Sequence, residues 1–204
     1  MEPPMRRRLA LLAMPALAAC SVLPSYDYVE PRRFPLAPQR QGQAATGPAR
    51  RVLLVRLMRA APGMESRGLR SLRPDGTEAL DFYAEWTAPP AEAAEEVLRR
   101  WLAESGRFSA VIATGSRIAP DLVLESELTS LVADLGTRQA RAGLSAVLLR
   151  QQGGQTQLVR QWSLQGSAPL APQGELPAEA LAQGMNAALA DALAALEQRL
   201  SRYG

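Results

Sequence analysis

The chain contains one thiol, Cys20, and neither histidine nor lysine, so few side chains are left for covalent or acid–base chemistry. These absences exclude Ser-His-Asp and Cys-His catalysis, the common zinc sites, and Schiff-base or Ser-Lys schemes. A pair of carboxylates could still act as acid and base. The acidic residues, however, occur mostly in the first turns of expected helices or beside arginines, where structural roles suffice. The composition therefore predicts a protein that is not an enzyme and that holds no metal or cofactor.

Cys20 itself stands at the end of a short leader of the export type. Arginines 6–8 form a basic region, Leu9 to Leu17 form an apolar run, and Ala18 and Ala19 precede the cysteine. This order is typical of a secretory signal with a small-residue cleavage site. The apolar run is well below the roughly 20 residues that cross a hydrocarbon core. The sequence also allows two alternatives to a leader that is cleaved directly before the cysteine. These are an ordinary secretory signal and an uncleaved membrane anchor.

A cysteine directly after Leu17-Ala18-Ala19 resembles the lipobox of bacterial lipoproteins. The resemblance implies a diacylglycerol on the Cys20 thiol, cleavage before the cysteine, and a fatty acyl group such as palmitate on the new amino terminus. One acyl chain anchors a protein only marginally, whereas two or more anchor it stably. We therefore expect a signal peptide at 1–19 and a mature chain that is held on a membrane by its acylated first residue.

Composition limits the rest of the chain to one ordinary globular domain. The precursor has 204 residues, with 47% hydrophobic and 21% charged residues, which is typical of a folded protein. Its formal net charge of +3 includes three arginines and one glutamate of the leader. The mature chain thus has 20 basic residues (23 minus 3) and 19 acidic residues (20 minus 1). This near balance gives little support for nucleic-acid binding.

The residues after Cys20 divide into a proline-rich segment and a folded part. The first of these is rich in Pro, Gln, Gly and Ala, which is typical of a tether. Phe34 and Leu36 are more apolar than a spacer needs, so part of this segment could dock on the domain. We expect a lipidated, flexible tether at 20–50 and a single domain at 51–204.

Hydrophobic periodicity places two helices and several strands in that domain. A helix is expected at 90–105, because prolines open it, acidic residues occupy its early turns and arginines its late ones. A closing helix with a leucine stripe is expected from 178 to about 202. The expected strands are 52–57, a hairpin of 67–72 with 78–86 around Pro74-Asp75-Gly76, and then 108–113, 121–133, 142–151 and 157–166. These elements predict an α+β fold of two layers, a mainly antiparallel sheet packed by two helices.

A series of short motifs follows the lipobox in a recognisable order. They are Phe34-Pro35-Leu36, Leu53-Leu54-Val55, Pro62-Gly63-Met64, Tyr83-Ala84-Glu85-Trp86, Pro89-Pro90, Gly106-Arg107-Phe108 and Asp121-Leu122-Val123-Leu124. This series resembles the ABC-type transport auxiliary lipoprotein family, which includes the lipoprotein of the Pqi intermembrane transport system. The resemblance covers nearly all of the mature chain, and its motifs contain no catalytic residue.

The resemblance implies a non-catalytic component of a lipid-transport apparatus of a Gram-negative bacterium. Its partners would be an ABC permease and ATPase and a protein with mammalian-cell-entry (MCE) domains. The lipoprotein would lie on the periplasmic face of the outer membrane, and Ser21 after the lipidated cysteine resembles an outer-membrane sorting signal. The alternatives are a structural or assembly lipoprotein of the outer membrane and a periplasmic hydrolase that uses carboxylates.

Several side chains outside Cys20 could contact lipid or a partner. Tyr83 and Trp86 are amphipathic aromatics of the kind found at interfaces, although they are more simply explained as anchors of the hairpin on the first helix. The closing helix could lie on the membrane or self-associate into a homo-oligomer, although its leucine stripe is more simply explained by packing on the sheet. Arginines that crowd the first strands could meet anionic headgroups or form a solvated strand face, namely Arg50, Arg51, Arg56, Arg59, Arg67, Arg70 and Arg73.

Overall fold

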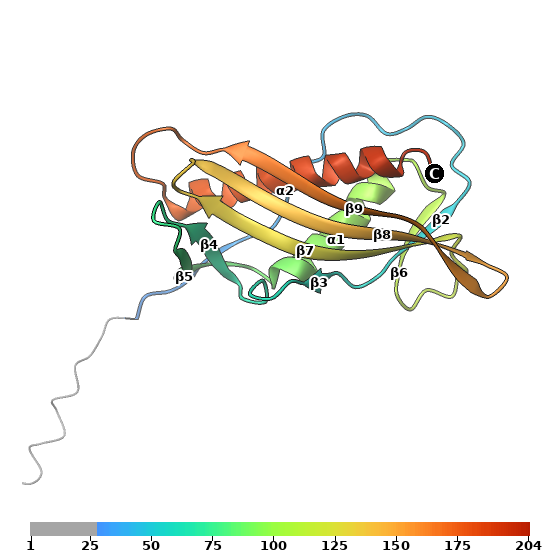
Figure 1. The fold of residues 1–204 in the computed structure, drawn as a ribbon, viewed down its shortest axis with the longest axis horizontal. Coiled ribbons are helices and arrows are strands. Elements are labelled where there is room, and N and C mark those ends of the chain that lie inside the picture. Colours follow the sequence, from blue (N-terminus) through green and yellow to red (C-terminus); the bar gives the residue numbers. More distant parts are fainter. Residues whose placement is uncertain (1–27) are drawn as a thin grey trace, which may run out of the picture. The chain divides into compact units, whose positions relative to one another are not determined.

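The computed structural model describes residues 28–204 and divides the chain into two units, Met1–Glu30 and Pro31–Gly204. The second unit holds the helices and strands of the described residues (Figure 1). In chain order these are β1 (Arg32–Phe34), β2 (Val52–Val55), β3 (Arg59–Ala60), β4 (Gly68–Leu72), β5 (Glu78–Trp86), α1 (Pro90–Glu104), β6 (Ala110–Ala113), β7 (Leu122–Asp134), β8 (Gln139–Gln152), β9 (Gln155–Pro169) and α2 (Ala178–Leu200).

Strand β7 is the centre of the sheet and is paired along both edges. On one edge it runs parallel to three short strands in succession, β2, β3 and β4. On the other edge it runs antiparallel to β8, which in turn runs antiparallel to β9. Farther out, β6 joins β2 in parallel, β5 joins β4 antiparallel, and β1 joins β5 in parallel. The strands of the described residues therefore form one mixed sheet of nine strands.

The α+β prediction is confirmed, and the expected run of antiparallel strands corresponds to β7, β8 and β9. The sheet is mixed rather than mainly antiparallel, because β2, β3 and β4 run parallel to β7. Parallel neighbours need a long crossover connection, and α1 supplies one between the first strands and β6 and β7. Strands β1 and β3 are only 3 and 2 residues long, too short for hydrophobic periodicity to predict.

Both helices pack on the same face of the sheet, as expected for two layers (Figure 1). Every second side chain of β7 points toward the helices, since side chains alternate along a strand. Leu122, Leu124 and Leu128 of this row are fully buried, at 0% exposure. The helices contribute the other half of the core, chiefly Ala94, Leu98, Trp101 and Leu102 of α1 and Met185, Leu189, Leu193, Leu196 and Leu200 of α2. Neither helix of the described part combines the length and apolar composition needed to span a membrane.

Helix α2 lies in direct backbone contact with β9 at one point. A Cβ atom on Gly166 would lie 2.1 Å from the carbonyl oxygen of Ala188 and 2.4 Å from the backbone nitrogen of Ala192. Both alanines are fully buried, at 0% exposure. The small residues on the two elements therefore allow the helix to approach the strand more closely than larger side chains would permit.

The segment 31–50, which the sequence analysis assigned to a tether, is part of the domain. Strand β1 pairs with β5, and the core includes Leu36, at 6% exposure, with Phe34 packed against it. The backbone N–H of Ala37 donates to Oδ1 of Asn186 on α2 at 2.7 Å. The docking expected for Phe34 and Leu36 is thus confirmed. Composition did not reveal that the whole segment docks, because proline and glutamine are as frequent in extended segments that lie on a folded surface as they are in flexible tethers.

Candidate functional site

The structure separates Tyr83 and Trp86, the two aromatic residues predicted to contact a partner or lipid. Trp86 is 1% exposed and lies in the core, so it positions β5 and is not accessible to a partner. Tyr83 is 56% exposed, and its neighbour Phe82, which the sequence analysis missed, is 78% exposed. Cys20, the predicted attachment point of the lipid, lies outside the described residues. The exposed aromatic pair is therefore Phe82 and Tyr83.

A bulge in β5 displays this aromatic pair. Gly68 of β4 pairs with Glu85, whereas Arg70 pairs with Leu80, so residues 81–84 of β5 stand opposite a single residue of β4. Such bulges interrupt strand pairing and redirect the side chains they carry. The bulge lies beside β1, because the register of β1 on β5 begins at Ala84. Phe82 and Tyr83 are thus presented next to the first strand of the domain.

Local contacts hold the bulge in place. One carboxylate oxygen of Asp81, Oδ1, accepts the backbone N–H groups of Tyr83 at 2.8 Å and of Ala84 at 3.0 Å. On the other side, a Cβ on Gly68 would lie 2.4 Å from the carbonyl oxygen of Asp81, so only glycine lets the two strands come this close. The aromatic pair is therefore displayed on a constrained backbone rather than on a loose loop.

The carboxylate of Glu85, which is largely shielded from solvent, joins β1 to the strands that carry the bulge. The side chain of Glu85 is 16% exposed, and it accepts a hydrogen bond from Arg33 Nε at 2.8 Å and another from Arg67 at 3.3 Å. The hydrogen bond from Arg33 is the main reason why the pKa of Glu85 lies below its ordinary value. These contacts fix the first strand of the domain against β5.

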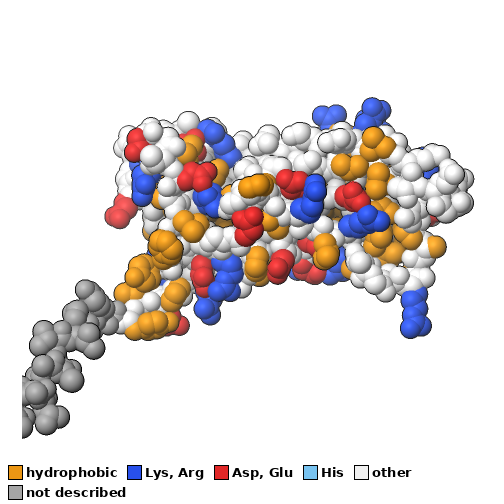
Figure 2. All heavy atoms as spheres, turned by 60° about the horizontal axis from the view of Figure 1, so that its bottom comes forward, with side chains coloured by type: hydrophobic (Ala, Val, Ile, Leu, Met, Phe, Trp, Pro, Cys, Tyr) orange, Lys and Arg blue, Asp and Glu red, His pale blue; other side chains and the backbone are white. Residues whose placement is uncertain are grey.

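Most arginines of the first strands are neutralised by acidic neighbours. Arg51 instead donates to the carbonyl oxygen of Tyr203, and Arg73 to the hydroxyl of Thr77. The ion pairs are Arg56 with Glu125, Arg59 with Glu127, Arg67 with Glu85, and Arg70 with Glu78. On the face drawn in Figure 2, blue and red side chains accordingly lie beside one another, with apolar side chains between them. The four ion-paired arginines therefore form a neutralised surface rather than a basic patch for headgroups.

A groove of about 590 Å³ lies between the segment 37–41 and one side of α2. Six of its eleven lining residues are apolar, and the lining consists of Ala37, Pro38, Gln39, Gln41, Trp101, Gln183, Asn186, Ala187, Ala190, Asp191 and Ala194. The one carboxylate in this lining, Asp191, accepts the backbone N–H of Ser167 at 3.1 Å. A facing pair of carboxylates, which the hydrolase alternative needs, does not line this groove. Its surface suits an apolar ligand or a partner segment.

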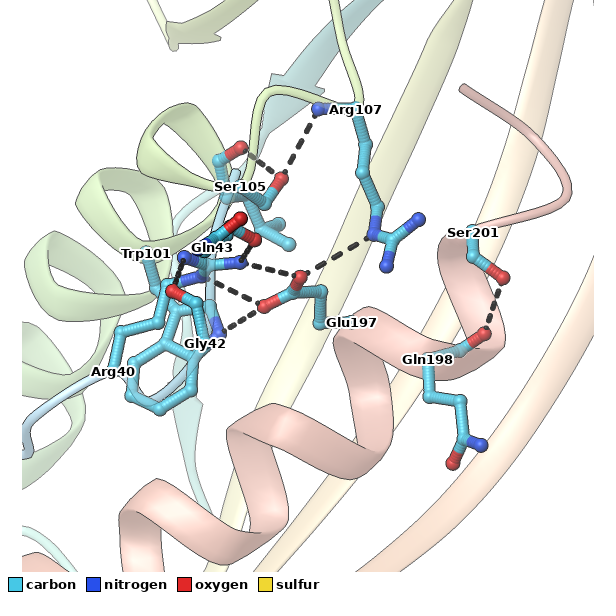
Figure 3. Close-up of polar contacts among 10 residues, drawn as sticks. Arg40, Gly42, Gln43, Trp101, Ser105, Arg107, Glu197, Gln198 and Ser201 are labelled. Carbon is cyan, nitrogen blue, oxygen red and sulfur yellow. Dashed lines mark hydrogen bonds and ion pairs between the residues drawn. The ribbon is translucent and has the colours of Figure 1, made fainter. Parts of the chain in front are cut away.

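Glu197 of α2 joins the N-terminal segment to both helices at one end of this groove (Figure 3). Its two oxygens accept hydrogen bonds from Arg40 at 2.9 and 3.0 Å, from Trp101 Nε1 at 2.8 Å, and from Arg107 Nε at 3.3 Å. Burial disfavours the charged form, but the hydrogen bonds from Arg40 and Trp101 outweigh it and hold the pKa of Glu197 below its ordinary value. The cluster is satisfied internally and has a structural role.

Comparisons with known proteins place the fold among solved structures. Protein XCC0632 from Xanthomonas campestris, described as a member of the family DUF330, is 21% identical over 80% of this chain and 92% of its own, with a TM-score of 0.65. An uncharacterized protein is 14% identical over 84% and 99%, with a TM-score of 0.58. The hypothetical protein CT253 from Chlamydia trachomatis is 11% identical over 76% and 98%, with a TM-score of 0.52. The chain shares their fold.

No family model and no curated protein matches the chain. The resemblance noted from the motifs therefore rests on those motifs alone.

The exposed pair leads to a prediction about membrane contact. If Cys20 carries the expected acyl chains, a photoreactive phenylalanine analogue in place of Tyr83 should form lipid adducts when the protein is bound to phospholipid vesicles, because aromatic rings favour the membrane interface. The same analogue in place of Ile118, which is 54% exposed against 56% for Tyr83, serves as the control. We expect about tenfold fewer adducts at Ile118, measured by mass spectrometry, since an interfacial preference of about 1.4 kcal/mol corresponds to that ratio. Equal labelling of the two positions would show that the bulge has no special contact with lipid.

Proposed function

We propose that this protein is a lipoprotein anchored to the outer membrane through acylated Cys20, where it acts as a non-catalytic component of an ABC/MCE-type lipid transport system. The alternative is a structural or assembly lipoprotein of the same membrane.

The display of Phe82 and Tyr83 beside β1 is the observation that carries the membrane part of this proposal. If the mature chain begins at an acylated Cys20, only residues 21–31 separate the anchor from β1. A chain of this length spans at most about 40 Å when fully extended. The end of the domain that carries the exposed aromatic pair would then stay near the membrane surface. This arrangement fits the amphipathic character of tyrosine at interfaces.

The transport part of the proposal is supported by the motif resemblance and by the groove along α2. A component that works by contact needs an accessible surface, and the groove offers small apolar side chains such as Ala187 and Ala190 over about 590 Å³. We place a partner's apolar segment there, because an alanine-lined groove allows the close approach that such packing needs.

Affinity capture from membranes tests this function. The acylated protein, cross-linked in the cell and purified, should bring down the MCE-domain protein or the permease of the same system. Ala187→Arg places a charge in the groove at an exposed position and should lower this capture at least tenfold. Ser163→Arg adds the same charge to an exposed position on the other face of β9 and should leave capture unchanged. Cys20→Ser should release the protein from the membrane fraction.

Two results would contradict the proposal, each in a different part. Capture of outer-membrane assembly proteins without any permease or MCE component would favour the alternative function. Membrane retention of the Cys20→Ser protein would overturn the anchor itself.

A further inference from the structure

A second hollow, of about 320 Å³, lies where the end of α2 meets the beginning of β9. It is lined by three arginines and two aromatic residues, Arg160, Trp162, Arg199, Arg202 and Tyr203. Arg160 and Trp162 are two residues apart on β9, so their side chains share one face of the strand. This is the face toward α2, since Leu164 and Gly166 continue it beneath the helix. The hollow thus opens where the helix stops covering the strand.

The three arginines of this hollow differ from most others in the molecule. Within the described residues, the side chains of Arg160, Arg199 and Arg202 make no hydrogen bond or ion pair, and no acidic side chain lines the hollow. By contrast, ion pairs hold Arg32, Arg33, Arg40, Arg56, Arg59, Arg67, Arg70, Arg99, Arg107 and Arg141. Glu197, two residues before Arg199, is occupied by Arg40 and Arg107. Three free guanidinium groups therefore gather in one concave place.

The aromatic walls of the hollow are fixed before any ligand arrives. The rings of Trp162 and Tyr203 meet edge to face, with centroids 6.1 Å apart and planes at 62°. Both rings pack against the hydrophobic core. The carbonyl oxygen of Tyr203 accepts a hydrogen bond from Arg51 at 2.9 Å, and its backbone N–H donates to Leu200 at 2.9 Å. Because the walls are held, a ligand has only the arginine side chains to order.

We propose that this hollow binds the phosphate group of a small anionic ligand, in the class of phospholipid headgroups. Guanidinium groups bind phosphate oxygens through paired, charge-assisted hydrogen bonds, and several converging on one anion give selectivity for phosphate over a single carboxylate. The concave shape beside the two rings suits a compact headgroup better than a flat protein surface. The proposal adds a ligand site to the domain and does not depend on the transport function.

The position of the hollow adds a constraint on the source of the ligand. Arg32 of β1 pairs with Glu179 in the first turn of α2, whereas Arg199 lies in the last turn. A helix of 23 residues is about 35 Å long, so the hollow and the aromatic bulge lie at opposite ends of α2. A headgroup bound in the hollow would therefore come from a lipid other than those beneath the bulge.

Binding of two soluble probes to the acylated full-length protein in non-ionic detergent tests this site. The probes are inorganic phosphate and glycerophosphoglycerol, the headgroup of phosphatidylglycerol without its acyl chains. Titration calorimetry gives the affinities. Arg199→Gln combined with Arg202→Gln should weaken binding at least tenfold. Arg100→Gln combined with Arg117→Gln removes two exposed arginines that also lack partners in the described residues, and should leave it unchanged.

The outcomes are distinct. Tighter binding of glycerophosphoglycerol identifies a headgroup as the source of the phosphate, and tighter binding of inorganic phosphate identifies free phosphate. Either result supports the site if the Arg199 and Arg202 double variant loses that binding. The site is overturned if neither probe binds, if both double variants weaken binding equally, or if only an acidic peptide such as polyglutamate binds. Thermal unfolding of both variants confirms that the exposed substitutions leave the fold intact.

Discussion

Gly166→Ala is expected to destabilise the domain by about 3 kcal/mol or more, at the upper end of the cost of overpacking a core. The new methyl group would lie 2.1 Å from the carbonyl oxygen of Ala188, and this neighbour is backbone rather than a flexible side chain. The clash can be relieved only by moving α2 away from β9, which opens the buried layer around Leu189 and Leu193. Urea unfolding followed by circular dichroism would show a lower midpoint concentration.

Gly47→Ala is the matched control for this substitution. A Cβ on Gly47 meets no atom within 4 Å, and its backbone does not adopt a left-handed conformation. Replacement there should be neutral or stabilise the protein by about 0.5 kcal/mol, because alanine restricts the unfolded chain. If both variants unfolded at the same urea concentration, the close contact between helix and sheet would be refuted.

Glu197→Gln is expected to cost about 3 kcal/mol of unfolding free energy, because it leaves a shielded arginine without its counter-charge. The side chain of Arg40 is only 10% exposed and has Glu197 as its one acidic partner within 4 Å among the described residues. The loss should loosen the segment 31–50, which limited proteolysis would detect. Glu96→Gln, which breaks an exposed pair with Arg99 on α1, should change stability by less than about 1 kcal/mol. Equal effects of the two substitutions would contradict the buried cluster.

The Glu197 cluster also makes stability depend on pH. The pKa of Glu197 is lower in the folded protein than its ordinary value, so the unfolded chain takes up a proton first as the solution is acidified. Its contribution is complete above the ordinary pKa of glutamate, about 4.3, and is lost as pH falls from there through the lower folded pKa. The difference in unfolding free energy between wild type and Glu197→Gln should therefore shrink between about pH 5 and pH 3.

Strong local patterns made the long elements predictable. The alternation along β7 and the leucine stripe of α2 each depend on many residues, so single exceptions did not hide them. The parallel pairing of β2, β3 and β4 with β7 could not be inferred, because parallel partners are far apart in sequence and share no turn. The segment 31–50 was assigned to a tether for a related reason, since its partners on β5 and α2 are far from it in the sequence.

The contact residues were predictable only in part. Tyr83 was found because it stands in a motif, but strict alternation would place Phe82 and Tyr83 on opposite faces, and the bulge cannot be foreseen from that rule. Glu197 did leave a signal, since it follows Leu189 and Leu193 at four-residue steps on the apolar stripe. An acidic residue in such a row indicates a buried partner. No pattern in the sequence indicated the arginine hollow, because β9 and the end of α2 converge only in three dimensions.

The edge position of β1 determines how the domain would respond to mechanical force. In an anchored molecule, tension between membrane and domain enters the fold at residue 31 and reaches β1, which holds β5 through 3 residues. The segment 31–50 would detach before the long ladder of β7 and β8 is strained. Each freed residue would lengthen the connection between membrane and domain by at most about 3.3 Å. The ion pair between Arg40 and Glu197 would then limit further extension, because it must break before the residues beyond 40 can be freed.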